Sequence, residues 1–74
     1  MNFDPQYFAA KVCGARNELR MSQTEFAKAI GVNKNTISNL ENGKNTPGAD
    51  TIMAICSVTG KTPNELLGWK PHAA

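Results

Sequence analysis

Two short helices, separated by a turn of only three residues, are predicted in the middle of the chain, and this pair constrains the fold most. Ser22-Gln23-Thr24-Glu25 has the form of a capping box, in which serine caps the helix and glutamate bonds back to its start. Gly31 ends this helix, since a glycine in the left-handed region follows many helix C-termini. Asn33 caps a second helix that extends to about Asn42. The two helices must therefore meet at a sharp angle.

The apolar residues of this pair fall on facing sides, which predicts that the two helices pack on each other. The small Ala27 lets the two backbones approach closely. The facing residues are Phe26, Ala27 and Ile30 on the first helix and Ile37 and Leu40 on the second.

The segment before this pair predicts a first helix. Asp4 can cap it, and Pro5 suits its first position, where a backbone amide hydrogen is not needed. We expect this helix to end near Arg20. Its apolar residues recur at the spacing of one helical face and form the stripe Phe8, Val12, Ala15 and Leu19.

Two more helices are predicted after the turn at residues 43–48. The start of the fourth helix stays open, because Thr46-Pro47 and Gly48 could each provide it. Thr62-Pro63-Asn64-Glu65 is a second capping box and begins a short fifth helix through Leu67. The sequence thus predicts an all-α fold, a compact five-helix bundle without strands. We expect a single domain over residues 1–74, with its core at about 5–67 and a tail at 68–74.

Composition excludes several classes of protein. With 74 residues there is room for one small domain. Two cysteines, Cys13 and Cys56, and the single His72 are too few for a structural zinc site, so no metal or cofactor is expected. The carboxylates do not pair into an acid–base site and no nucleophile has a plausible base, so we expect no enzyme. Without a signal peptide or a membrane-spanning run, a cytoplasmic protein is expected.

The second helix of the central pair is unusual in its polarity. Residues 33–45 contain five asparagines, and as a helix this segment loses about 2–3 kcal/mol relative to alanine. Asparagine can pair with adenine in the major groove and lysine with guanine, so the exposed face could read DNA. The alternative is a solvated surface helix, although such a face more often carries glutamate and lysine. The net charge of +2 permits a nucleic acid as partner without requiring one.

The central segment resembles the helix-turn-helix domains of phage repressors, Cro and their XRE-like bacterial relatives. The resemblance extends over about three-quarters of the chain, from Val12 to Leu67. It implies a lambda-repressor-like DNA-binding domain, and hence a transcriptional regulator of double-stranded DNA. The matching residues are Ser22-Gln23-x-Glu25-Phe26-Ala27, Gly31-Val32, Thr36-Ile37-Ser38-x-Leu40-Glu41-x-Gly43-Lys44 and Pro47.

The resemblance also implies roles for individual residues. The positions that read base edges in the family are Lys34, Asn35, Thr36 and Asn39. The positions that contact DNA phosphates are Gln23, Asn42 and Lys44. Arg16 and Glu41 match a buried ion pair of some family members; two unrelated surface charges are the alternative.

Two positions depart from the family pattern, Thr59 where a large aliphatic residue is usual and Lys61 where valine is frequent. They predict looser packing between the fourth and fifth helices, with either a thinner core or a covering partner. We expect a repressor that binds a palindromic operator as a homodimer, because one recognition helix reads only a few base pairs. Its predicted dimer contact is Leu66, Leu67 and Trp69, with Trp69 alternatively a flap on the core. The rival function is an adaptor or antitoxin-type module that docks a partner protein, such as a toxin or anti-repressor.

Overall fold

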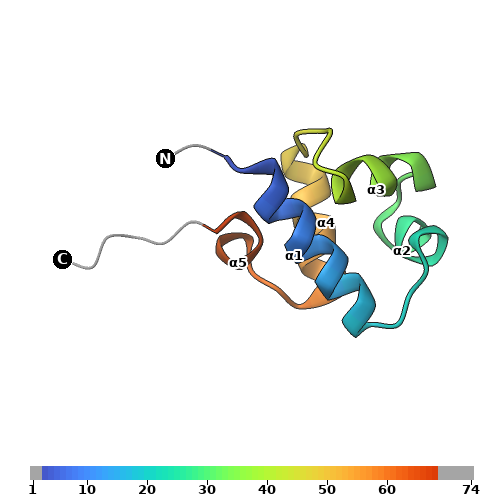
Figure 1. Cartoon of the computed structure of the whole chain (residues 1–74). Helices are drawn as coiled ribbons and strands as arrows, with labels where there is room; N and C mark the ends of the chain where they lie inside the picture. Colours follow the sequence, from blue (N-terminus) through green and yellow to red (C-terminus); the bar gives the residue numbers. More distant parts are fainter. Residues whose placement is uncertain (1–2, 69–74) are drawn as a thin grey trace.

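The computed structural model describes residues 3–68, in which five helices follow one another (Figure 1). No strand is present in this part of the chain, and the predicted all-α fold is confirmed. The predicted tail lies outside the described residues, apart from Gly68. The helices are α1 (Pro5–Glu18), α2 (Gln23–Ile30), α3 (Lys34–Glu41), α4 (Ala49–Thr59) and α5 (Pro63–Leu67).

The helices begin where side chains or proline favour it. The Asp4 carboxylate accepts hydrogen bonds from the backbone N–H groups of residues 6 and 7 at the start of α1. Both predicted capping boxes are present; in the first, the Glu25 N–H donates to Ser22 Oγ at 3.1 Å and the Ser22 N–H donates to Glu25 Oε1 at 2.9 Å. Gly48 occupies the N-cap of α4 without a side-chain bond, which answers the question the sequence left open.

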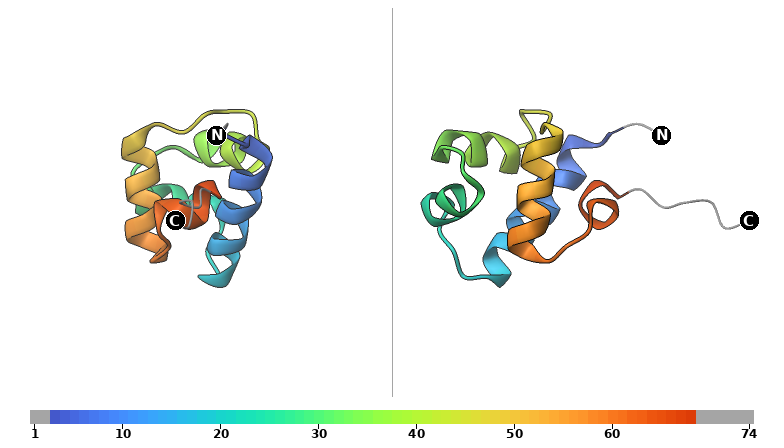
Figure 2. Two further views of the ribbon diagram at one scale, coloured as in Figure 1. Left: turned by 90° about the vertical axis from the view of Figure 1, so that its left-hand side faces the viewer. Right: turned by 180° about the vertical axis from the view of Figure 1, so that it is seen from behind.

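All five helices contribute to one core (Figure 2). The α1 helix contacts α3, α4 and α5, whereas α2 contacts α3 and α4. Because α3 meets the rest of the domain through only one face, its other face remains at the surface. The core residues are Phe8 and Val12 of α1, Phe26 and Ala27 of α2, Ile37 and Leu40 of α3, Ile55 of α4 and Leu66 of α5.

The end of α1 differs from the sequence prediction. The helix ends at Glu18 rather than near Arg20, and Leu19 is 40% exposed instead of buried. The reason is local: Leu19 is the C-cap, and Arg20 takes a left-handed conformation with φ of 57°, which turns the chain away from the core. The predicted apolar stripe therefore ends at Ala15. Ile30 of α2 is likewise only partly buried.

The turn between α2 and α3 depends on Gly31. Its φ of 91° lies in the left-handed region, where a side chain is strained. The N–H groups of Gly31 and Val32 both donate to the Ala27 carbonyl, at 2.8 and 3.0 Å. These bonds terminate α2 and direct the chain at once into α3.

Candidate nucleic-acid interface

The α3 helix presents a polar face to solvent and is anchored in the core by two apolar residues. Ile37 and Leu40 are 0% and 2% exposed, and they fix the orientation of the helix. Of the four predicted base-reading residues, Lys34 and Asn35 are exposed, and Thr36 and Asn39 are half-buried. The structure thus places these side chains on or beside the free face of one helix, with Lys34, Asn35 and Thr36 in its first turn and Asn39 one turn further on.

The first turn of α3 suits an anionic partner. It contains Lys34 and no acidic residue, so nothing opposes the partial positive charge of the helix N-terminus. Asn33 Oδ1 accepts hydrogen bonds from the Thr36 N–H at 2.8 Å and from Thr36 Oγ1 at 3.0 Å. Because the hydroxyl proton of Thr36 is used in this cap, its oxygen can act toward a ligand only as an acceptor.

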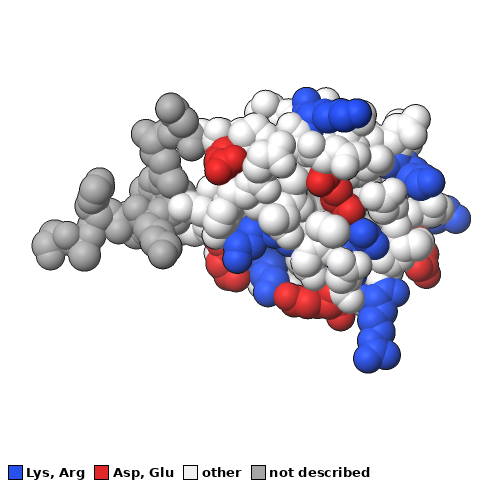
Figure 3. All heavy atoms as spheres, in the orientation of Figure 1, with Lys and Arg blue, Asp and Glu red and all other residues white. Residues whose placement is uncertain are grey.

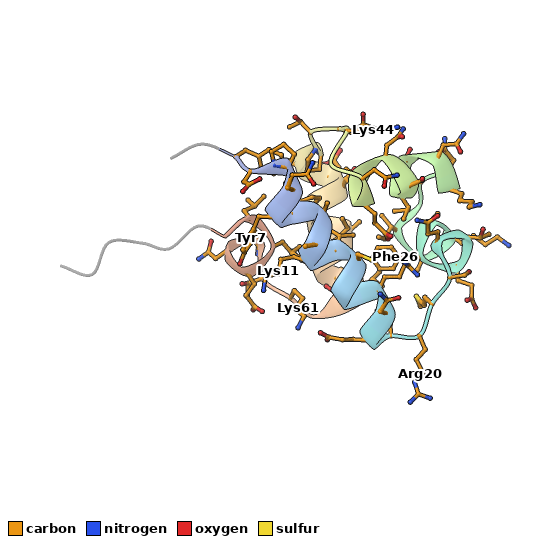
Figure 4. All side chains as sticks on the ribbon, in the orientation of Figure 1. Tyr7, Lys11, Arg20, Phe26, Lys44 and Lys61 are labelled. Carbon is orange, nitrogen blue, oxygen red and sulfur yellow. The ribbon has the colours of Figure 1, made fainter. Side chains whose placement is uncertain are left out.

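The predicted phosphate-contacting residues lie around this face. Asn42 is the exposed C-cap of α3, and its Nδ2 lies 3.5 Å from Ser38 Oγ. Lys44 is exposed in the loop after α3 and extends outward beside that helix (Figure 4). In Figure 3, basic side chains occur at the edges of the molecule where α3 and this loop lie. Cations and amides therefore surround the face of α3.

Gln23 has a second partner that the sequence did not indicate. Its Nε2 donates to Glu41 Oε1 at 3.2 Å. The two residues are 18 positions apart on different helices, and no periodicity connects them. The amide group of Gln23 is thus oriented by Glu41 through its nitrogen, whereas the Glu25 N–H at the start of α2 is bonded to Ser22 Oγ.

Glu41 and Arg16 form the predicted ion pair. Arg16 Nε donates to Glu41 Oε2 at 2.7 Å and Nη2 donates to Oε1 at 3.1 Å, and the two side chains are only 15% and 6% exposed. The guanidinium also donates to the Met21 carbonyl at 2.8 Å, and Cys13 Sγ lies 3.8 Å from Nη2. One bidentate pair therefore joins α1 to the end of α3, and through Gln23 to α2.

This arrangement shifts the ionisation of both groups. Burial acts to raise the pKa of Glu41, but the hydrogen bonds from Arg16 and Gln23 outweigh it, so the pKa lies below the ordinary value. The hydrogen bond to Glu41 raises the pKa of Arg16, against the opposing effect of burial. Both groups are therefore charged at neutral pH.

We expect Glu41 to make the stability of the domain depend on acid. Because the folded pKa is lowered, the unfolded state binds the proton first, and the stabilisation is lost as pH falls from about 4.3 through the folded pKa. Denaturant unfolding of the wild type and Glu41→Gln between pH 7 and 3 measures this. The difference in unfolding free energy should shrink toward acid; a difference that stays constant would contradict the expectation. Glu25→Gln is the control, because hydrogen bonds with Ser22 also lower the pKa of the exposed Glu25 carboxylate.

The residues predicted for a dimer contact fall in different places. Leu66 is 1% exposed and belongs to the core, so its side chain offers no surface to a second copy, which corrects the prediction. The reason is that Leu66 lies on the inner side of the five-residue α5, in the core shared by all five helices. Leu67 is partly buried at the edge of the core. Trp69 lies outside the described residues.

Thr59 and Lys61, the two positions that depart from the family pattern, both have polar partners. Thr59 Oγ1 donates to the Ile55 carbonyl at 2.7 Å and accepts the Lys61 N–H at 3.2 Å. Lys61 Nζ lies 3.4 Å from a carboxylate oxygen of Glu18. The looser packing of the fourth and fifth helices stays a prediction.

Two further kinds of site are absent between residues 3 and 68. The cysteines and acidic residues of this region form no group of three or more that could hold a metal ion. None of its helices has the length and apolar character needed to cross a membrane.

Comparisons with known proteins agree with this geometry. The helix-turn-helix family model matches residues 15–66. A curated relative, the ImmF control region 10 kDa protein of Bacillus phage phi105, is 35% identical over 52 residues, which make up 70% of this chain. The chain spans 58% of the length of that relative.

Solved structures show the same fold at low sequence identity. The P22 c2 repressor, crystallised with a synthetic operator, has a TM-score of 0.78 and 23% identity, over 81% of this chain and 91% of that one. The restriction-modification controller protein C.AhdI of Aeromonas hydrophila has a TM-score of 0.78 and 21% identity, over 85% and 91%. The clp gene regulator ClgR of Corynebacterium glutamicum has a TM-score of 0.79 and 20% identity, over 89% and 70%.

The matched region contains the capping box of α2, the turn at Gly31, α3 and the Arg16–Glu41 pair. The chain therefore belongs to the XRE-type helix-turn-helix family. This family consists of DNA-binding transcription regulators, not enzymes.

Proposed function

We propose that the protein is a sequence-specific transcriptional repressor in the cytoplasm that binds a palindromic operator as a homodimer. The observation that carries the proposal is the free polar face of α3, which is anchored by Ile37 and Leu40 and has a first turn without acidic residues. The relatives support it, since one is a P22 repressor solved with an operator and another comes from a phage control region.

In this proposal, the residues at the face of α3 divide into two groups. Lys34, Asn35, Thr36 and Asn39 reach base edges in the major groove, where amides pair with adenine and lysine with guanine. Gln23, Asn42 and Lys44 hold phosphates on either side and set the register of the helix. Thr36 contributes only an acceptor or its methyl group, because its proton is bound to Asn33.

A second copy is needed because one helix reads few base pairs. In two-fold proteins of this class, two recognition helices reach half-sites about 34 Å apart on one face of DNA. We propose the outer end of α5 as the contact, with Leu67 and the following Trp69, while Leu66 remains in the core.

The test is selection of bound sequences from random double-stranded DNA, followed by footprinting. We expect an enriched palindrome, a protected site with two half-sites, and two protein chains bound per site. Affinity should fall steeply with salt, because phosphate contacts release counterions. Enrichment of one short, non-palindromic site bound by a single chain would overturn the homodimer. Absence of any salt-dependent DNA binding would favour the adaptor that docks another protein.

A further inference from the structure

The turn between α1 and α2 contains an arginine in a conformation that this chain otherwise gives to glycine. Arg20 has a φ of 57°, and no other residue besides glycine has a positive φ between residues 3 and 68. Its N–H donates to the Asn17 carbonyl at 3.0 Å, and the next N–H, that of Met21, donates to the Arg16 carbonyl at 3.3 Å. Glycine usually occupies this position, because a Cβ is strained there. The left-handed residues that follow the other four helices are Gly31, Gly43, Gly60 and Gly68.

Contacts inside the described part of the chain do not account for this strain. The Arg20 side chain is exposed and extends away from the domain (Figure 4). None of the acidic groups of residues 3–68 lies within ion-pair distance of it. The acids nearest in sequence have other partners, since Glu18 lies 3.4 Å from Lys61 Nζ and Glu25 bonds to Ser22. The guanidinium is therefore available to an anion from outside the domain.

The turn is held firmly against the elements of the candidate interface. Arg16 Nη1 donates to the carbonyl of Met21, the residue after Arg20, at 2.8 Å. The same guanidinium binds Glu41 at the end of α3, and Glu41 accepts the hydrogen bond from Gln23 at the start of α2. The backbone beside Arg20 is thus fixed relative to Gln23, which lies three residues further along the chain. Figure 4 shows Arg20 and Lys44 at opposite edges of the domain.

We propose that Arg20 is a further phosphate-contacting residue of the DNA interface, on the Gln23 side of α3. This inference rests on the proposed function and adds a cation to the three residues assigned to phosphates there. The planar guanidinium suits a phosphate because two of its N–H groups can bind two oxygens at once. Such a contact positions the protein without reading sequence. Strain that folding does not need is then retained for binding.

Arg20→Gly separates binding from folding. Glycine adopts a positive φ without strain, so Tm should be equal to that of the wild type or higher. Affinity for the selected operator and for scrambled DNA should fall alike, by about two- to fivefold, the value of one exposed ion pair. The slope of affinity against salt should decrease by about one unit. Arg20→Lys keeps the charge and should keep the wild-type slope. Lys11→Ala is the matched control, because it removes an exposed cation of α1 on the side of α5 (Figure 4) and should leave the slope unchanged.

Four outcomes would overturn the inference. Wild-type affinity and slope in Arg20→Gly would show that the arginine does not meet DNA, while the proposed function stands. A Tm several degrees below that of the wild type would assign Arg20 to the fold. Weaker self-association of Arg20→Gly in sedimentation without DNA would assign it to a contact between two chains. Absence of salt-dependent DNA binding by the wild type would overturn the proposed function as well.

Discussion

Glu41→Ala should destabilise the domain by about 3–5 kcal/mol, because it leaves the Arg16 guanidinium largely buried without its partner. Arg16→Ala should cost a similar amount for the converse reason, since the Glu41 carboxylate is 6% exposed. A domain of 74 residues has a total stability of roughly 4–11 kcal/mol. Either change therefore removes a large part of it, and at this size Tm should fall by roughly 12–40 °C.

Thermal and denaturant unfolding measure this loss. The matched control is Lys61→Ala, which removes an exposed ion pair with Glu18 whose side chains are 34% and 66% exposed. An exposed pair contributes only about 0–1 kcal/mol, so the control should unfold close to the wild type. If Glu41→Ala and Arg16→Ala also melted within a degree or two of the wild type, the pair would have no structural importance.

The second large effect is expected in the affinity for operator DNA. Asn35→Ala or Asn39→Ala should weaken binding to the operator by about 1–3 kcal/mol and relax the preference at a base pair. The reason is that these two residues are four positions apart and so lie on one side of α3, the side that is proposed to face the bases. Lys44→Ala should instead weaken binding to all DNA alike and reduce the salt slope by about one unit.

Each variant is measured on the selected operator and on scrambled DNA at two salt concentrations. Ser57→Ala, an exposed change on α4 outside the proposed contacts, is a control for general effects of substitution. Equal losses on both DNAs for the asparagine variants would show that the face of α3 does not read sequence. A loss confined to the operator for Lys44→Ala would assign that lysine to base reading.

The order and extent of the helices could be predicted closely, because local signals determine them. The capping boxes at Ser22 and Thr62 and the glycine at residue 31 act within a few residues, and each is where the sequence predicts it. Leu19 was mispredicted because its helical periodicity is real but the helix ends at Glu18, one residue earlier. Periodicity alone does not report where a left-handed residue such as Arg20 will turn the chain.

Contacts between distant residues were harder to predict. The Arg16–Glu41 pair could be anticipated only through the family resemblance, since 25 positions separate its members. The bond from Gln23 to Glu41 had no such signal, and neither residue type nor spacing indicates it. Leu66 was assigned to a surface because a five-residue helix near the end of a chain has too short a pattern to distinguish its inner from its outer face.

The contacts of Glu41 bear on how an operator would be recognised. Because one carboxylate joins α1, α2 and α3, we expect α3 and the residues around it to move as one body. The protein would then lose little conformational entropy on binding DNA, so less of the free energy of its contacts would be offset by the cost of ordering. In the proposed complex, a rigid recognition helix would not adjust to each half-site, so the DNA would bend and twist to fit it. Base pairs that no side chain touches, at the centre of the operator, would then influence affinity through their stiffness.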